Sequence, residues 1–218
     1  TDYIDFYLIH WPDVNTPLEE TADTLKELKK AGKIRFSGIS NFEEPQLEQL
    51  YDLGVLDVVQ FPYSMVNRSK EEVLKKYSAK GVATMGYGSL GAGILTGAIR
   101  ELPHFDEHDA RLGFYDFFVE PKFSRVMKLV NVLDKIAEAR QIPVAQVTIN
   151  WTQQRPFINT SLTGVRNAKE AYEAVYGKTD EAAEVKHTTV EEMEKELHEN
   201  AEHQMEYVNE LKNKSLKK

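Results

Sequence analysis

Short, β-rich apolar runs alternate regularly with amphipathic helical stretches along this chain. Before residue 98, the strand-like runs begin about every 22–30 residues. The runs predict strands over residues 3–11, 34–39, 56–61, 82–87 and 158–162. Apolar residues at helical spacing predict helices over residues 17–30, 45–53, 69–79, 124–140, 144–154 and 168–175. Because strands joined by helical crossovers run parallel, this order predicts an α/β protein, either a doubly wound sheet or a closed (β/α) barrel.

A stretch with neither pattern interrupts this order at residues 98–122. It contains two prolines and a group of four aromatic residues, Phe114, Tyr115, Phe117 and Phe118. We expect a long irregular loop there, and long loops in compact domains usually carry function. The aromatic side chains either form an apolar wall of a ligand site or pack against the barrel.

The character of the chain changes after residue 176. We therefore expect two parts, a partial barrel over residues 1–176 and a charged helical tail over residues 177–218. In the tail, Thr189 and Glu192 have the spacing of a capping box, and apolar residues follow at helical spacing. This predicts one amphipathic helix, a candidate surface for self-association. Two of its three histidines, His198 and His203, stand four residues after glutamates, which is typical of a solvated helix face, so no metal site is expected.

Composition excludes several classes of function. The net charge of -8 and the pI of about 5.4 argue against a nucleic-acid-binding protein that relies on positive charge. No apolar run reaches the roughly 20 residues that a membrane-spanning helix needs, so no membrane partner is expected. The absence of cysteine is typical of proteins of the reducing cytoplasm, and we expect a cytoplasmic location.

Polar residues gather where the predicted strands end. The strands run into His10, Ser40-Asn41, Gln60, the run from Tyr87 to Gly93, and the run from Thr163 to Arg166. Each of these alone has a structural explanation, such as a satisfied histidine, a helix cap or a turn. The carboxyl ends of parallel strands lie at the same end of a sheet or barrel. The joint occurrence of these polar residues therefore predicts a polar rim around that end of the fold.

The residue types on this rim suit a ligand that contains phosphate, an amide and a ring. Gly88, Ser89 and Gly91 let backbone N–H groups approach an anion. Gly164 and Arg166 precede a predicted helix, so a guanidinium and a helix N-terminus face the same anion. The polar side chains after the second and third strands suit an amide, and the tyrosine after the fourth suits ring stacking. These properties indicate a nicotinamide dinucleotide as the ligand, held in another way than by the GxGxxG fingerprint of other dinucleotide-binding proteins.

Five motifs lie in a fixed order over residues 1–176. They read DYID leading to LIHWP, then GISNF, VQ followed by YS, YGSLGAG and GVRN. In these motifs the chain resembles the C-terminal part of an aldo-keto reductase. The resemblance implies a (β/α)8 TIM barrel, incomplete in this chain with about five βα units, and NAD(P)H-dependent reduction of aldehydes or ketones to alcohols.

The resemblance assigns a role to each matching residue. His10 resembles the active-site histidine that orients the substrate carbonyl. The residues that match cofactor ligands are Ser40, Asn41, Gln60, Tyr87, Gly88, Ser89, Leu90, Gly91, Gly164, Arg166, Glu170 and Glu173. By resemblance, the first three bind the carboxamide, Tyr87 stacks on the nicotinamide, residues 88–91 hold the pyrophosphate and the last four contact the adenosine end.

Two positions on the adenosine side depart from the family pattern. Glu170 stands where the family usually has glutamine, and Ala174 stands where it usually has asparagine. The family resemblance implies NADPH as the cofactor. The extra carboxylate disfavours the 2′-phosphate of NADPH, so NADH is the alternative. The substrate that the family implies is a small carbonyl compound.

The proton donor of the family is a tyrosine tuned by a lysine and an aspartate, all before the fourth barrel strand. Nothing in the 218 residues replaces them, so we expect this chain to be inactive alone and to form the C-terminal portion of a working reductase. One alternative is a truncated, non-catalytic relative that acts as a binding or regulatory module. Another is a different barrel enzyme that uses His10 in another role.

Overall fold

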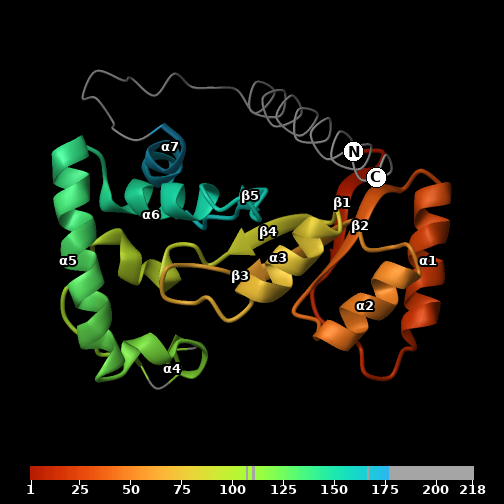
Figure 1. Ribbon diagram of the computed structural model, residues 1–218, viewed down its shortest axis with the longest axis horizontal. Coiled ribbons are helices and arrows are strands. Elements are labelled where there is room, and N and C mark those ends of the chain that lie inside the picture. Colours follow the sequence, from red (N-terminus) through yellow and green to blue (C-terminus); the bar gives the residue numbers. More distant parts are fainter. Residues whose placement is uncertain (107, 110, 166, 177–218) are drawn as a thin grey trace.

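The computed structural model describes residues 1–106, 108–109, 111–165 and 167–176, and a parallel β-sheet forms its centre. The described strands are β1 (Ile4–Ile9), β2 (Ile34–Ser40), β3 (Val58–Pro62), β4 (Ala83–Tyr87) and β5 (Thr160–Ser161). They pair in chain order, and every pairing is parallel. This sheet, with β1 and β5 at its edges, confirms the predicted α/β class and fits an incomplete (β/α)8 barrel (Figure 1).

Helices follow the first three strands and pack against the sheet. They are α1 (Leu18–Lys30), α2 (Glu44–Asp52) and α3 (Glu71–Ala79). At the start of α2, the side chains of Glu43 and Gln46 each accept a hydrogen bond from the other's backbone N–H, which satisfies two donors that a helix start leaves open. The glycines that the sequence places after these helices, Gly32, Gly54 and Gly81, have φ of +68°, +74° and +82°. Such values suit glycine and end each helix before the next strand.

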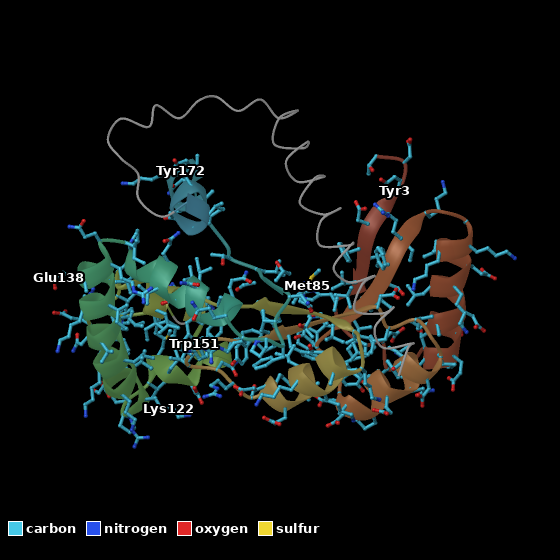
Figure 2. All side chains as sticks on the ribbon, turned by 45° about the horizontal axis from the view of Figure 1, so that its top comes forward. Tyr3, Met85, Lys122, Glu138, Trp151 and Tyr172 are labelled. Atoms are coloured by element: carbon cyan, nitrogen blue, oxygen red, sulfur yellow. The ribbon has the colours of Figure 1, made fainter. Side chains whose placement is uncertain are left out.

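The main core lies between the sheet and these three helices. Val59 and Phe61 of β3 are fully buried, and they pack in one cluster with leucines that the helices direct inward, Leu25, Leu50 and Leu74. Burying each such side chain contributes about 1.5–3 kcal/mol. The ring of Tyr63, just after β3, stacks on Trp151 of α6 (Val144–Gln153) with centroids 5.7 Å apart, which ties this helix to the sheet. Figure 2 labels Trp151.

A second core holds the part of the chain that follows β4. Its elements are η1 (Gly91–Thr96), α4 (Arg111–Phe114), η2 (Asp116–Phe118), α5 (Lys122–Arg140) and α6 (Val144–Gln153), and α7 (Ala168–Tyr176) comes after β5. Ile94, Phe118 and Val130 lie at its centre and are at most 2% exposed. Figure 1 shows α5 at the opposite end of the molecule from α1.

The stretch 98–122 is more ordered than the sequence predicts. It contains α4 and η2, and α5 begins at Lys122 rather than at residue 124. The reason is burial, because Phe117 and Phe118 are 5% and 2% exposed in the second core. Phe114 is 72% exposed. The aromatic residues therefore divide between packing and surface.

Two of the predicted strands are too long. The ladder of β5 covers Thr160 and Ser161 rather than residues 158–162, because the Asn159 side chain takes over one bond: its Oδ1 accepts the Thr84 N–H at 2.8 Å. The strand predicted over residues 3–11 ends at Ile9. Trp11 lies beyond the last residue paired with β2 and is 56% exposed.

Among the described residues, no helix is both long and apolar enough to cross a membrane. The tail over residues 177–218 lies outside the described residues, and so does its predicted amphipathic helix. Arg166 and the side chain of Glu173 lie outside them as well.

Candidate functional site

Side chains at the carboxyl ends of β1, β2 and β4 are joined in one hydrogen-bond network. The Tyr87 hydroxyl donates to Asn41 Oδ1 at 2.8 Å. Asn41 Nδ2 donates to the backbone oxygen of His10 at 3.1 Å and to Ser40 Oγ at 3.0 Å. The structure thus brings these predicted rim residues together at the carboxyl end of the sheet, where His10 takes part through its backbone oxygen.

The backbone of Asn41 explains how the network forms. Its φ is +60°, in the left-handed region that asparagine tolerates better than most residues. The chain therefore turns sharply at the end of β2, and the amide reaches back to β1. Burial, with a smaller effect from nearby Tyr115, raises the pKa of Tyr87. The hydroxyl consequently stays protonated and remains a donor at neutral pH.

Two further predicted residues lie at the strand ends outside this network. Gln60 pairs in register with Ser40 across β2 and β3, and its amide nitrogen lies 4.0 Å from the Met85 sulfur, which is a weak contact. The exposed His10 ring lies beside Trp11, with centroids 5.7 Å apart. Neither the His10 ring nor the Gln60 side-chain oxygen has a hydrogen-bond partner among the described residues. Both groups are available to a ligand.

Gly88, the residue after Tyr87, is part of the wall of a cavity of about 670 Å³. The cavity is lined by the segment after β4, by α4 and the residue that follows it, by α6, by the residues after β5 and by α7. The predicted cofactor residues in its lining are Gly88, Ser89, Leu90, Gly164 and Glu170. A volume of this size is typical of sites for small-molecule ligands and cofactors.

The glycine-rich segment that lines the cavity is tightly turned. Gly88, Gly91 and Gly93 have φ of +68°, +57° and +94°. The Gly91 N–H donates to the Gly88 oxygen at 2.9 Å, so Gly91 closes the turn, and its own N–H is already used. The N–H groups of Ser89 and Leu90 donate to no described residue. Backbone donors left open in this way favour an anion.

The Ser89 side chain is used differently from its backbone. Its hydroxyl forms a short hydrogen bond with the hydroxyl of Ser161 at the end of β5. The side chain therefore ties the glycine-rich segment to the sheet edge. The backbone N–H is left to meet a ligand.

A residue of the cavity wall also carries a buried polar atom with no hydrogen-bond partner among the described residues, which favours a polar ligand. The Thr163 Oγ1 atom is buried and has no hydrogen-bond partner among the described residues, and Thr163 lines the cavity. An unsatisfied buried hydroxyl costs about 1–3 kcal/mol. A polar ligand atom would satisfy it, so the residues present fit a polar, anionic cofactor.

Arg111 also lines the cavity and is a charged residue that the sequence pattern alone does not single out. Its guanidinium makes a two-pronged pair with Asp109, with Nε–Oδ1 at 2.9 Å and Nη2–Oδ2 at 2.6 Å. Arg111 lowers the pKa of Asp109 to about 2. The signal that could have found the pair is an Asp-x-Arg sequence inside the stretch predicted to be functional. Sequence spacing alone does not show that this part of the chain folds back over the cavity.

Asn167 directly precedes α7, which begins at Ala168 as the sequence predicts. Its Oδ1 accepts the backbone N–H of Glu170 at 3.0 Å, in the position of a helix cap. Glu170 and Ala174 on the following turn both line the cavity. The departures noted in the sequence therefore face the candidate ligand site.

Several known proteins are similar to this chain. A model of the Aldo/keto reductase family matches residues 1–193. An aldo-keto reductase of Bacillus subtilis (strain 168), YhdN, is 39% identical over 168 residues, which are 76% of this chain and 50% of the relative. The NADH-specific methylglyoxal reductase of Escherichia coli (strain K12) is 27% identical over 200 residues, which are 90% of this chain and 60% of the relative.

A solved structure has a similar fold. The glycerol dehydrogenase AKR11B4 from Gluconobacter oxydans matches with a TM-score of 0.73 and 26% identity, over 96% of this chain and 58% of its own. The chain belongs to the aldo/keto reductase family. It spans about half the length of the curated relatives it matches.

Proposed function

We propose that this chain provides the dinucleotide-binding side of an NAD(P)H-dependent carbonyl reductase. The observation that carries the proposal is the cavity of about 670 Å³, because unsatisfied donors of Ser89, Leu90 and Thr163 meet there beside a guanidinium. Such a wall suits the phosphates of a dinucleotide. Membership of the family supports the same assignment.

In this proposal, the cofactor extends from the strand ends to α7. Ser40, Asn41 and Gln60 bind the carboxamide, and the ring of Tyr87 lies against the nicotinamide. Residues 88–91 hold the pyrophosphate through Ser89 and Leu90 N–H, with Gly91 shaping the turn. When bound, the nicotinamide supplies the hydride that reduces a carbonyl carbon.

The remaining predicted residues complete the proposal. Gly164, Arg166, Glu170 and Glu173 contact the adenosine end, and Arg111 adds a charge for the phosphates. His10, exposed at the end of β1, orients a small aldehyde or ketone. We expect reduction to need the family's tyrosine, lysine and aspartate as well, so the 218-residue chain should bind dinucleotide without turnover.

The identity of the dinucleotide depends on Glu170. Its side chain lines the cavity, and a carboxylate there disfavours the doubly charged 2′-phosphate of NADPH. NADPH is the cofactor that the family resemblance favours, and NADH is the alternative. We expect Glu170→Gln to strengthen NADPH binding more than NADH binding.

The test is a calorimetric titration of the full chain with NADPH and NADH. We expect saturable binding that Thr163→Val weakens about 2–12-fold, because one hydrogen bond to the ligand is lost. The same substitution should leave thermal stability unchanged or raise it, since it removes an unsatisfied buried hydroxyl. Thr24→Val on the distant α1 is the control, and it should not change affinity. A chain that is folded but binds neither dinucleotide would contradict the proposal and favour a non-catalytic module.

A further inference from the structure

Arg111 is the single lysine or arginine among the described residues that line the cavity. An arginine side chain at the surface normally samples many rotamers, and immobilising it on a ligand reduces affinity. An arginine held in place before the ligand arrives avoids that loss. The contacts of Arg111 therefore determine how much it contributes.

Two contacts fix the guanidinium. The first is the Asp109 carboxylate, which accepts hydrogen bonds from Arg111 Nε at 2.9 Å and from Nη2 at 2.6 Å. The same carboxylate also accepts the Arg111 backbone N–H at 2.9 Å. On its flat face, the Arg111 Cζ atom lies 4.4 Å from the centroid of the Phe105 ring. Phe105 packs edge-on against Phe118, which is 2% exposed in the second core, with centroids 4.9 Å apart. The guanidinium is thus anchored to the core through two rings.

The way Asp109 binds leaves part of the guanidinium unused. The carboxylate occupies the Nε–Nη2 side, and Nη1 has no hydrogen-bond partner among the described residues. An arginine offers five N–H donors, so the Nη1 donors and a second donor on Nη2 remain for a ligand. A phosphate can bind there without displacing the carboxylate.

We propose that Asp109 is a positioning residue for cofactor binding, which holds Arg111 so that Nη1 and Nη2 bind the pyrophosphate of the dinucleotide. The assignment to the pyrophosphate follows from the glycine-rich segment, since Gly88, Ser89 and Leu90 line the same cavity as Arg111. This inference rests on the proposed function. It adds a residue that does not touch the ligand but sets the geometry of one that does.

The chain offers a matched control for this pair. Arg100 and Asp134 form a two-pronged pair of the same kind, with Nη1–Oδ2 at 2.6 Å and Nη2–Oδ1 at 2.8 Å. The exposed fractions of the arginine side chains are also similar, 48% for Arg100 and 43% for Arg111. Neither Arg100 nor Asp134 lines the cavity.

The experiment titrates NADH and NADPH into the full chain and into the variants Asp109→Asn, Arg111→Gln, their double variant, Asp134→Asn and Arg100→Gln. Arg111→Gln should weaken binding about 10–100-fold through the lost charged hydrogen bonds. Asp109→Asn should weaken it about 3–10-fold, as expected for one arginine that must be ordered on binding. In the Arg111→Gln background, Asp109→Asn should have no further effect, and the two control variants should bind like the unsubstituted chain. Circular dichroism checks folding, and Asp109→Ser is a second variant if Asp109→Asn unfolds.

Several results would overturn the proposal. Tighter binding by Asp109→Asn would make the carboxylate a competitor of the phosphate. An equal loss in the Arg111→Gln background would mean that Asp109 acts independently of Arg111. A loss for NADPH much larger than for NADH would place Arg111 at the 2′-phosphate instead. If the unsubstituted chain is folded and binds neither dinucleotide, the proposed function itself fails, and the assignment fails with it.

Discussion

At the scale of single residues, Glu71 links the end of β3 to α3. It accepts hydrogen bonds from the Tyr63 hydroxyl at 3.0 Å and from Arg68 Nη2 at 2.8 Å, and it pairs with Lys75 at 2.8 Å. Hydrogen bonds from Arg68 and then Lys75 are the main causes that lower the pKa of Glu71 to about 2, against an ordinary value of 4.5. Because the folded pKa is the lower one, this stabilisation is present above about pH 4.5 and is lost as the pH falls toward 2.

We expect Glu71→Gln to lower the free energy of unfolding by about 1.5–3 kcal/mol at pH 7, because a buried hydroxyl loses its charged acceptor. The difference from the unsubstituted chain should shrink as the pH is lowered from 4.5 toward 2. Urea unfolding at a series of pH values measures both effects. Glu72→Gln is the control, since Glu72 is 86% exposed and pairs with Lys75 on the surface. A pH-independent difference would contradict the linkage.

Gly38 in β2 is required by a close approach of two backbones. A Cβ built on it would lie 2.3 Å from the Val58 carbonyl oxygen on β3, a distance that neither backbone can accommodate. Gly38→Ala should therefore destabilise the chain by about 1–3 kcal/mol or more and disturb the β2–β3 ladder. Gly113→Ala, where a Cβ meets nothing within 4 Å, should have little effect in the same thermal unfolding measurement. Equal effects would mean that the strands separate easily.

Sequence reasoning recovers single residues of the site best where they follow strands. Ser40, Asn41 and Tyr87 were predicted for one rim, and the structure joins the last two directly. Arg111 was missed because its place over the cavity depends on how an irregular stretch packs. The unused Thr163 hydroxyl could not be foreseen either, since burial and hydrogen-bond satisfaction are properties of the folded chain.

At the scale of elements, the alternation of patterns locates the strands and helices, but it sets their ends poorly. Helix α1 begins at Leu18, one residue from the predicted start, because its apolar spacing is regular. β5 is shorter than predicted, because the Asn159 side chain replaces one of its backbone bonds. The stretch 98–122 was expected to be irregular because its two prolines obscure the helical pattern, whereas tertiary burial orders η2 and the start of α5.

The aromatic residues of the stretch 98–122 should contribute unequally to stability. Phe118→Ala should cost about 3–5 kcal/mol, because Phe118 fills the second core and contacts Phe105, Tyr115 and Phe117. Phe114→Ala should change stability by no more than about 0.5 kcal/mol, because its ring is 72% exposed. Chemical denaturation of the two variants measures the difference. Similar losses would indicate that Phe114 also packs in the core.

At the scale of the whole molecule, the two cores have different tasks. The first joins the sheet to α1, α2 and α3 and fixes the strand ends that carry His10, Asn41 and Tyr87. The second holds η1 and η2 against α5 and supports the outer wall of the cavity through Phe118. The cavity lies where the segment after β4 meets α4 and α7. Binding of a dinucleotide there would contact segments distant in the sequence.

The assignment of this cavity to the cofactor can be measured by hydrogen–deuterium exchange of the full chain, with and without saturating NADPH. We expect slower exchange in the segment 88–93 after β4, in residues 162–165 and around Arg111, with no change in α1. The largest protection is expected at the N–H groups of Ser89 and Leu90, which have no described partner in the free chain. Unchanged exchange throughout, or protection confined to elements that do not line the cavity, would contradict the assignment of this cavity to the cofactor.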